Sequence, residues 1–343
     1  MQKKLFLWLT VATAVIVLLA ALIQRGYRSS TAMEVEQVAL TSDWGEQLPQ
    51  AAAIRLDSPA GEVNLNLDGE RWRVAERHDY PADNGKVWKL LEQVGDITLI
   101  TAKTDNPKLH QRLGLDSRDQ ANAESMQVTI RNAAGEVMAD FLIGKDRPAA
   151  GQGDRQFYLR RSAENQTWVA QGQIRPSRLA SAWLDRNLID IAQSRMREVT
   201  IQHPDKPPVK VGRESVVDPF VLEAIPAGRS VKTTELTAIA YGLQKLQLSD
   251  VNQAETAGLQ WEDTIKVDFK TFDGLMVTVR VQAKDLGIVG QFVASGEGDA
   301  AAEAEALNHR LTPWVFVIPN HTVSTFTREQ EELLEPLNEG DQE

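Results

Sequence analysis

Apolar side chains recur with the same helical spacing at two places in the chain. The first set is Val87, Leu90, Leu91 and Val94, and the second set, 149 positions later, is Leu236, Ile239, Ala240 and Leu243. Residues at i, i+3, i+4 and i+7 lie on one face of an α-helix. Each set therefore predicts an amphipathic helix that packs on a core.

Other residues match at nearly the same separation. The matching pairs are Trp72 with Phe220, Gly135 with Gly274, and Trp168 with Trp314, at offsets of 148, 139 and 146 positions. The repeated order of turns, aromatic residues and helices predicts that the chain after residue 30 is one module written twice. A duplication of this kind fixes an architecture and suggests a scaffold or a binding surface, but it names no reaction.

Around the predicted helices the pattern changes to the alternation that is typical of β-strands. Val63, Leu65 and Leu67 alternate with polar residues before the turn signal Asp68-Gly69. The same period of two runs through Met126, Val128 and Ile130, and in the second module through Ile265, Val267 and Phe269. Alternating runs joined by short turns predict half-buried strands in antiparallel hairpins.

The N-terminal segment Leu5–Ile23 has 19 residues and no charge. As a helix it would span roughly 28 Å, close to the ~30 Å core of a bilayer. A cleaved signal peptide is the rival interpretation, but its apolar region is normally shorter and a cleavage site follows at once. Here Gln24-Arg25-Gly26-Tyr27-Arg28 follows, which favours an uncleaved transmembrane anchor. Because there is no cysteine, a lipoprotein anchor is excluded.

The segment is expected to cross the membrane once and to leave the large domain outside the cytoplasm, which in a bacterium means an inner-membrane anchor and a periplasmic domain. The charge bias across the segment is nearly even, because Lys3 and Lys4 precede it while Arg25 and Arg28 follow it. The orientation therefore depends on the short tail being easier to retain than to export.

These patterns together predict an α+β fold class. The N-terminal transmembrane helix is followed by two duplicated modules, each a mainly antiparallel sheet with an amphipathic helix on one face. The predicted parts are a cytoplasmic tail and anchor (1–30), a tether (31–50), module one (51–175), a helical connector (176–195), module two (196–325), and a C-terminal helix with an acidic tail (326–343). The Ala-, Glu- and Gly-rich segment 295–307 has no counterpart in module one and predicts an exposed insertion, with a short helix as one form.

The charge balance excludes one class of partner. The net charge is −11, and residues 1–30 contribute four of the basic side chains, so the remainder carries −15. Nucleic-acid binding needs clustered Lys and Arg, and we expect no nucleic-acid partner.

No motif for chemistry stands out. None of the five histidines has a second histidine at i+3 or i+4, and neither a nucleophile elbow nor a phosphate loop is present. Asp79 and Asp83 precede the first helix and are expected to cap it or to be solvated, and His110 is expected to be structural. The tryptophans are expected in the core. We therefore predict no catalytic, cofactor-binding or metal-ligating residues, no cofactor, and no enzymatic activity.

Several short motifs occur in a specific order. They are Gly69-Glu70-Arg71-Trp72, Val87-Trp88-Lys89-Leu90-Leu91, Leu113-Gly114-Leu115, Phe141-Leu142-Ile143-Gly144-Lys145, Phe157-Tyr158-Leu159-Arg160 and Trp183-Leu184-Asp185-Arg186-Asn187-Leu188. In this order the chain resembles the bacterial membrane-anchored family catalogued as domain of unknown function 4340, most clearly over residues 55–250.

The resemblance implies a function but no site. Genes of that family often lie beside an ABC-type exporter and a gliding-motility-type auxiliary subunit. It therefore implies a non-enzymatic, membrane-anchored periplasmic accessory protein whose partners are an ABC transporter permease and a gliding-type auxiliary subunit, with the bilayer contacted through the N-terminal helix. The alternative is an extracytoplasmic module that binds a glycan or a lipid in the groove between the two modules.

Overall fold

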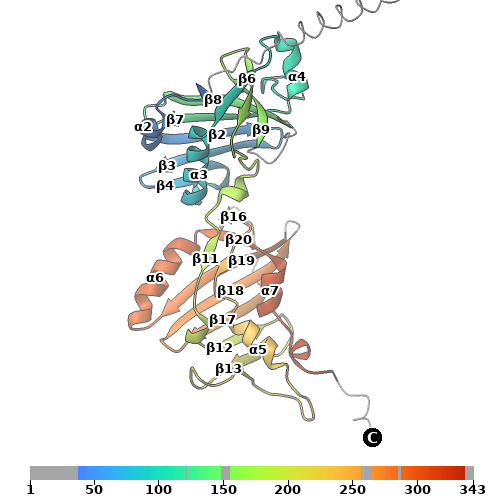
Figure 1. Cartoon of the computed structure of the whole chain (residues 1–343). Coiled ribbons are helices and arrows are strands. Elements are labelled where there is room, and N and C mark those ends of the chain that lie inside the picture. The colour runs from blue at the N-terminus through green and yellow to red at the C-terminus, as the bar shows by residue number, and fades with distance from the viewer. Residues whose placement is uncertain are drawn as a thin grey trace, which may run out of the picture. The chain divides into compact units, whose positions relative to one another are not determined.

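The computed structural model describes residues 38–120, 122–147, 155–255, 258, 264–284 and 287–336 (Figure 1). The chain divides into two compact units, which are described separately. Unit 1 comprises residues 1–62 and 88–178, and unit 2 comprises residues 63–87 and 179–343.

The described strands form two large antiparallel sheets and one small one. The first large sheet has the order β1-β6-β10-β9-β8-β7-β2-β3-β4-β5. Its strands are β1 (Val38–Ala39), β2 (Ala51–Ser58), β3 (Gly61–Asp68), β4 (Arg71–Val74), β5 (Tyr80–Pro81), β6 (Thr98–Ala102), β7 (Met126–Asn132), β8 (Val137–Arg147), β9 (Gln156–Arg161) and β10 (Thr167–Gln171).

The second large sheet has the order β14-β13-β12-β17-β18-β19-β20-β16, and β11 pairs with β15 in the small sheet. The strands are β11 (Asn187–Ile189), β12 (Met196–Gln202), β13 (Val209–Gly212), β14 (Val221–Leu222), β15 (Leu246–Gln247), β16 (Asp250–Gln253), β17 (Ile265–Thr271), β18 (Leu275–Lys284), β19 (Gly287–Gly296) and β20 (Trp314–Ile318).

Helices are few and mostly short in the described chain. The α-helices are α2 (Trp44–Gln47), α3 (Asn84–Gly95), α4 (His110–Leu113), α5 (Thr233–Ala240), α6 (Asp299–Leu311) and α7 (Asn320–Phe326). The 3₁₀ turns are η1 (Leu48–Gln50), η2 (Ala75–Arg77), η3 (Pro107–Leu109), η4 (Ala180–Trp183), η5 (Gln193–Arg195) and η6 (Gln330–Leu333).

The two large sheets share one strand order. The strands of the two copies can be matched in chain order, and matched strands then have matching neighbours in both sheets. The first copy consists of β2, β3, β4, β6, β7, β8, β9 and β10, and the second consists of β12, β13, β14, β16, β17, β18, β19 and β20. In each copy one helix, α3 or α5, follows the third of these strands. The apolar stripes identified in the sequence lie in these helices or at their ends, and all eight side chains are buried.

Small irregularities are repeated as well. The register of β2 against β7 shifts by one residue between Ala51 and Ala53, and that of β12 against β17 shifts between Met196 and Glu198. The turns that follow β7 and β17 contain Gly135 (φ 82°) and Gly274 (φ 89°). Glycine has no Cβ atom and adopts a positive φ without steric strain, which explains why both turns have glycine at matching positions.

The predicted fold class is wrong. The described chain is mainly antiparallel sheet with few helices, because most of its buried apolar residues follow a period of two rather than 3.6. Among the described residues no helix has both the length and the apolar character needed to cross a bilayer. The predicted transmembrane segment Leu5–Ile23 lies outside the described residues.

The segments expected to link the modules also differ from expectation. Within the predicted tether, residues 38–50 form β1, α2 and η1, and Trp44 is buried with its indole nitrogen donating to the Leu91 carbonyl oxygen (2.8 Å). Residues 176–195 form short 3₁₀ turns and β11 instead of a helix. The Asp185 carboxylate accepts a hydrogen bond from the Asn187 backbone nitrogen, and the chain then pairs with β15. The pairing of β11 with β15 therefore decides the structure of this segment, against the predicted helix.

The predicted C-terminal helix and the predicted exposed insertion also differ from the structure. Within 326–343 the described residues form the 3₁₀ turn η6, capped by Glu329 and Glu332. Segment 295–307 contains the start of α6, whose Ala300, Ala304 and Leu311 are buried. Because α6 presents small residues on one face, it packs closely on β19 instead of standing free in solvent.

Two of the family-like motifs lie against each other in unit 1. The turn after α4 brings the Leu113 and Gly114 carbonyl oxygens onto β8, where a Cβ atom on Gly144 would lie 2.4 Å from the first and 3.0 Å from the second. Arg160 is buried nearby, and its guanidinium donates to the carbonyl oxygens of Leu115, Ser162 and Glu164. Glycine at position 144 is thus required by the approach of another backbone segment.

We predict that Gly144→Ala destabilises the protein and that Gly45→Ala does not. The added methyl at position 144 must displace backbone, which costs about 1–3 kcal/mol. A Cβ atom on Gly45, in α2, meets nothing within 4 Å, and alanine there favours the helix. Urea unfolding monitored by tryptophan fluorescence measures both variants. Equal midpoints for the two would contradict this account of Gly144.

Candidate functional site

The acidic residues before α3 and two of the histidines have structural roles. Asp83 accepts a hydrogen bond from the Lys86 backbone nitrogen (3.1 Å) at the start of α3, and Asp79 lies in the preceding turn with a φ of 59°. The imidazoles of His110 and His203 are buried against the carbonyl oxygens of Asn165 and Arg328. No group of three or more potential metal ligands occurs among the described residues.

The tryptophans are divided between buried and half-buried positions. Trp72 and Trp183 are buried, and Trp88, Trp168 and Trp314 are half-buried. Trp261 lies outside the described residues. The ring of Trp314 packs edge-on against Tyr80, with 5.1 Å between ring centroids.

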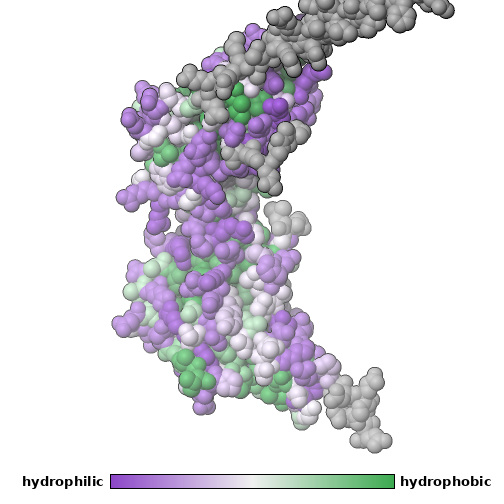
Figure 2. Space-filling model, in the orientation of Figure 1, coloured by the Kyte–Doolittle hydropathy of each residue, from purple (hydrophilic) through white to green (hydrophobic). Residues whose placement is uncertain are grey.

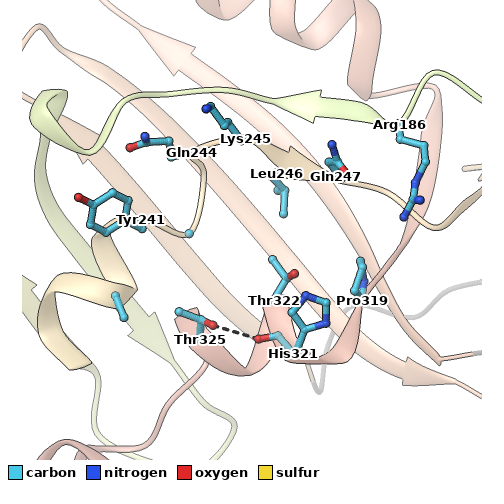
Figure 3. A pocket seen from close by; sticks show the side chains of 12 residues that line it. Arg186, Tyr241, Gln244, Lys245, Leu246, Gln247, Pro319, His321, Thr322 and Thr325 are labelled. Atoms are coloured by element: carbon cyan, nitrogen blue, oxygen red, sulfur yellow. Dashed lines mark hydrogen bonds between the residues drawn. The ribbon is translucent and has the colours of Figure 1, made fainter. Parts of the chain in front are cut away.

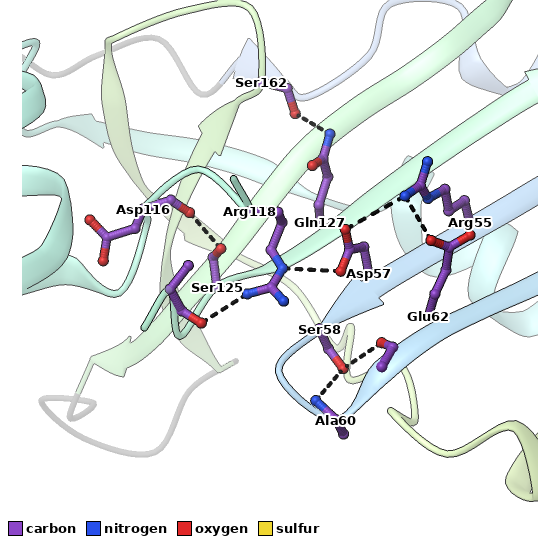
Figure 4. A network of polar contacts seen from close by, with 12 residues as sticks. Arg55, Asp57, Ser58, Ala60, Glu62, Asp116, Arg118, Ser125, Gln127 and Ser162 are labelled. Carbon is purple, nitrogen blue, oxygen red and sulfur yellow. Dashed lines mark hydrogen bonds and ion pairs between the residues drawn. The ribbon is translucent and has the colours of Figure 1, made fainter. Parts of the chain in front are cut away.

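The polar network in Figure 4 joins a loop to a hairpin in unit 1. Arg118 donates to the Asp57 carboxylate (3.1 Å) and to the Ala123 carbonyl oxygen (2.8 Å), while Arg55 pairs with Glu62 (2.7 Å). The Ser125 hydroxyl donates to the Asp116 carbonyl oxygen. Each carboxylate of the Arg118–Asp57 and Arg55–Glu62 pairs faces a guanidinium, and Arg118 links the Ala123 backbone to Asp57 of β2.

Groups with shifted pKa values are explained by structural contacts. Burial raises the pKa of Tyr80 to about 12. Hydrogen bonding from Thr271 and then from Arg195 lowers the pKa of Asp273, and the same Arg195 donates to both carboxylate oxygens of Glu303 in α6. These interactions attach α6 to the turn after β17, and they account for the perturbed charges without a cleft or a ligand.

A different kind of surface lies at the β14 edge of the second large sheet. Four apolar side chains between residues 213 and 225 face solvent, and the most exposed of them, Val217, is 91% accessible. The other three are Val216, Val221 and Ile225. We call these four side chains the 213–225 surface. Figure 2 shows hydrophobic residues at the molecular surface near the end of unit 2 that carries β13.

Val216 and Val217 occupy the tip of a tight turn. The Asp218 backbone nitrogen donates to the Ser215 carbonyl oxygen (3.2 Å), and the Ser215 backbone nitrogen donates to the Asp218 carboxylate (2.9 Å). The centre of such a turn favours Gly, Pro, Asn or Asp. Two β-branched apolar residues at that position therefore break a local rule, which is expected where a surface serves binding.

Arg213 holds this turn in place. Its guanidinium donates to the backbone oxygens of Met196 (2.9 Å), Val216 (2.7 Å), Gln193 (2.9 Å) and Ser194 (2.9 Å). It also lies 4.5 Å from the ring centroid of Phe220, which is buried. These contacts use the planar fork of donors that only arginine offers. The valines are consequently presented on a fixed loop.

A groove of about 680 Å³ runs beside the turn. It is lined by Arg197, Glu198, Lys210, Gly212, Arg213, Glu214, Asp218, Pro219, Val221 and Glu223. Hydrogen bonding from Lys270 lowers the pKa of Glu198, and Lys210 pairs with Glu223 (3.4 Å). The groove thus places charged side chains next to the exposed valines, and an apolar centre with a polar surround is the anatomy of a protein interface.

Sequence reasoning did not identify this surface. The available signal was the length of the connection between the second and third strands of each copy. In the first copy Gly69 and Glu70 alone join β3 to β4, whereas residues 213–220 join β13 to β14. The longer loop in the second copy therefore changes the surface of that copy and leaves the order of its strands unchanged.

We predict that Arg213→Lys loosens the turn. Lysine cannot contact the four backbone oxygens together or stack on Phe220, so the loop should open more often. Elastase, which cleaves after small apolar residues, should cut at residues 213–220 roughly tenfold faster in this variant. Arg280→Lys, on the exposed face of β18, serves as the control. An unchanged cleavage rate would show that Arg213 does not hold the loop.

Comparison with known proteins identifies one family. The family model described as domain of unknown function DUF4340 matches residues 72–261, which is more than half of the chain. No curated protein and no solved structure matches the chain. The match covers β4 to the segment before β17, and thus most of the first copy and the start of the second. The chain belongs to the DUF4340 family.

Proposed function

We propose that this chain is a non-enzymatic interaction protein that acts as an accessory subunit of an ABC-type transporter complex on the periplasmic side of the bacterial inner membrane. Its partners are the transporter permease and a gliding-type auxiliary subunit. The proposal combines the implication of the family resemblance with one observation, the pair of exposed valines that Arg213 holds on a rigid turn.

The energetics of the turn support a binding role. Each buried valine side chain contributes on the order of 1.5–3 kcal/mol, and a fixed loop loses little entropy when a partner covers it. Val216 and Val217 sit beside a groove in which Lys210 pairs with Glu223 and Glu198 pairs with Lys270, so a partner that covers the groove need not neutralise these charges. An apolar hot spot with a polar surround is the arrangement that concentrates binding energy.

We expect the double variant Val216→Asp/Val217→Asp to lose the partner without unfolding. Both side chains are exposed, so the carboxylates stay solvated in the free protein but would be buried unpaired in the complex. Crosslinking in cells followed by purification of the full chain measures the recovery of transporter subunits, which should fall by more than about tenfold.

The matched control is Val137→Asp/Val293→Asp, which places the same two charges at two other exposed valines, 52% and 45% accessible. Its recovery of subunits should equal that of the wild type. The proposal fails if the wild-type chain recovers neither a permease nor an auxiliary subunit, or if the two double variants behave alike.

A further inference from the structure

A second concave site lies in unit 2, away from the residues of the 213–225 surface. It is a cleft of about 390 Å³ between the end of α5, the β15 segment and α7 (Figure 3). Its lining residues are Arg186, Ala238, Tyr241, Gly242, Gln244, Lys245, Leu246, Gln247, Pro319, His321, Thr322 and Thr325. The volume falls at the lower end of the range for small-molecule sites.

The charge of this cleft is opposite to that of the chain. Three lining residues, Arg186, Lys245 and His321, carry or can carry a positive charge, and the lining contains no Asp or Glu. The whole chain has 48 acidic and 37 basic side chains. A twelve-residue lining without a carboxylate therefore departs from the composition around it, and it favours an anionic ligand.

The cations are not neutralised by neighbouring side chains. Most arginines of the described chain pair with a carboxylate or are saturated by carbonyl oxygens, but Arg186 donates only through its Nε, to the Leu248 carbonyl oxygen (2.9 Å). Within the described residues, neither Arg186 nor Lys245 forms an ion pair. Asp190 is the nearby acid, and its carboxylate accepts from the Lys245 backbone nitrogen (3.0 Å), outside the lining.

The backbone positions these cations before any ligand arrives. The Leu248 backbone nitrogen donates to the Arg186 carbonyl oxygen (3.0 Å), so the two residues exchange hydrogen bonds and the guanidinium keeps its two terminal nitrogens for a ligand. Lys245 has a φ of 51°, a left-handed conformation that is uncommon for a long side chain. This conformation turns the chain from the end of α5 into β15.

Neutral hydrogen-bonding groups complete the lining. Figure 3 shows Arg186 at one end of the cleft and Tyr241 at the other, with Thr322 and His321 on the side of α7 and Gln244 and Gln247 on the opposite side. Hydroxyl and amide groups recognise the hydroxyls of a polyol, and a guanidinium recognises a phosphate through two parallel hydrogen bonds. The two recognition elements lie in one cleft.

We propose that this cleft binds the phosphate ester of a polyol, with Arg186 on the phosphate and the hydroxyl and amide side chains on the polyol. This site is separate from the 213–225 surface and does not depend on the transporter proposal. The same chemistry is offered by a free polyol phosphate and by the phosphoglycerol headgroup of a lipid, and the experiment distinguishes the two sources.

The test is titration calorimetry on the full chain with glycerol 3-phosphate, with glycerol and sodium chloride of equal ionic strength as blanks. A second arm measures sedimentation with phosphatidylglycerol vesicles against phosphatidylcholine vesicles. We expect saturable binding in one arm. In Arg186→Gln this binding should weaken by about tenfold or more, because the cation that contacts the phosphate is lost.

The control variant is Arg280→Gln, which removes one arginine from an exposed position on β18 and should bind as the wild type does. Lys245→Gln removes a positive charge of the lining but no contact to the phosphate, so it should give a smaller loss, and it leaves the Arg186–Leu248 hydrogen bonds intact if Arg186→Gln is unstable. No binding in either arm, or an equal loss in the control, would overturn the assignment. Binding of free glycerol 3-phosphate alone identifies a soluble ligand, and binding to phosphatidylglycerol vesicles alone identifies a lipid headgroup.

Discussion

Each large sheet depends on one long-range pairing, in which the first strand of a copy, β2 or β12, lies beside β7 or β17, the second strand of the same sheet after the helix. In the first copy Ile54 and Leu56 of β2 face Ile130 and Val128 of β7. In the second copy Val199 and Ile201 of β12 face Phe269 and Val267 of β17. All eight side chains are buried. Without this contact each large sheet would divide into two smaller sheets, and these buried apolar side chains would lose their cross-strand partners.

Local features of this architecture could be predicted from sequence, and long-range ones could not. The helix stripes, the turn glycines Gly135 and Gly274, and the alternating strands carry their own signal, because each depends on residues close in the chain. The pairing of β11 with β15 carries no such signal, and the segment 176–195, which contains β11, is predicted from the sequence to be a helix. Trp44 likewise packs on Leu91 through a contact that no local pattern announces.

Both candidate sites escaped sequence reasoning for the same physical reason. The 213–225 surface depends on Arg213 reaching backbone oxygens at 193, 194 and 196, which only the folded chain brings close. The cleft is lined by Arg186, Lys245 and His321, and the first and last of these are more than a hundred residues apart in the sequence. In both cases the repeated sheet is common to the two copies, and the features that suggest binding lie in the connections.

The helix α6 illustrates what this architecture tolerates. It is inserted between β19 and β20, two strands that remain hydrogen-bonded neighbours, while the matching strands β9 and β10 of the first copy are joined by the short segment 162–166. The pairing of these two strands therefore does not depend on the length of the chain that connects them. The corresponding corner of the first copy is the exposed turn 163–165. The backbone oxygens of Glu164 and Asn165 bind the buried Arg160 and His110, so a domain fused at this corner must leave these two acceptors in place.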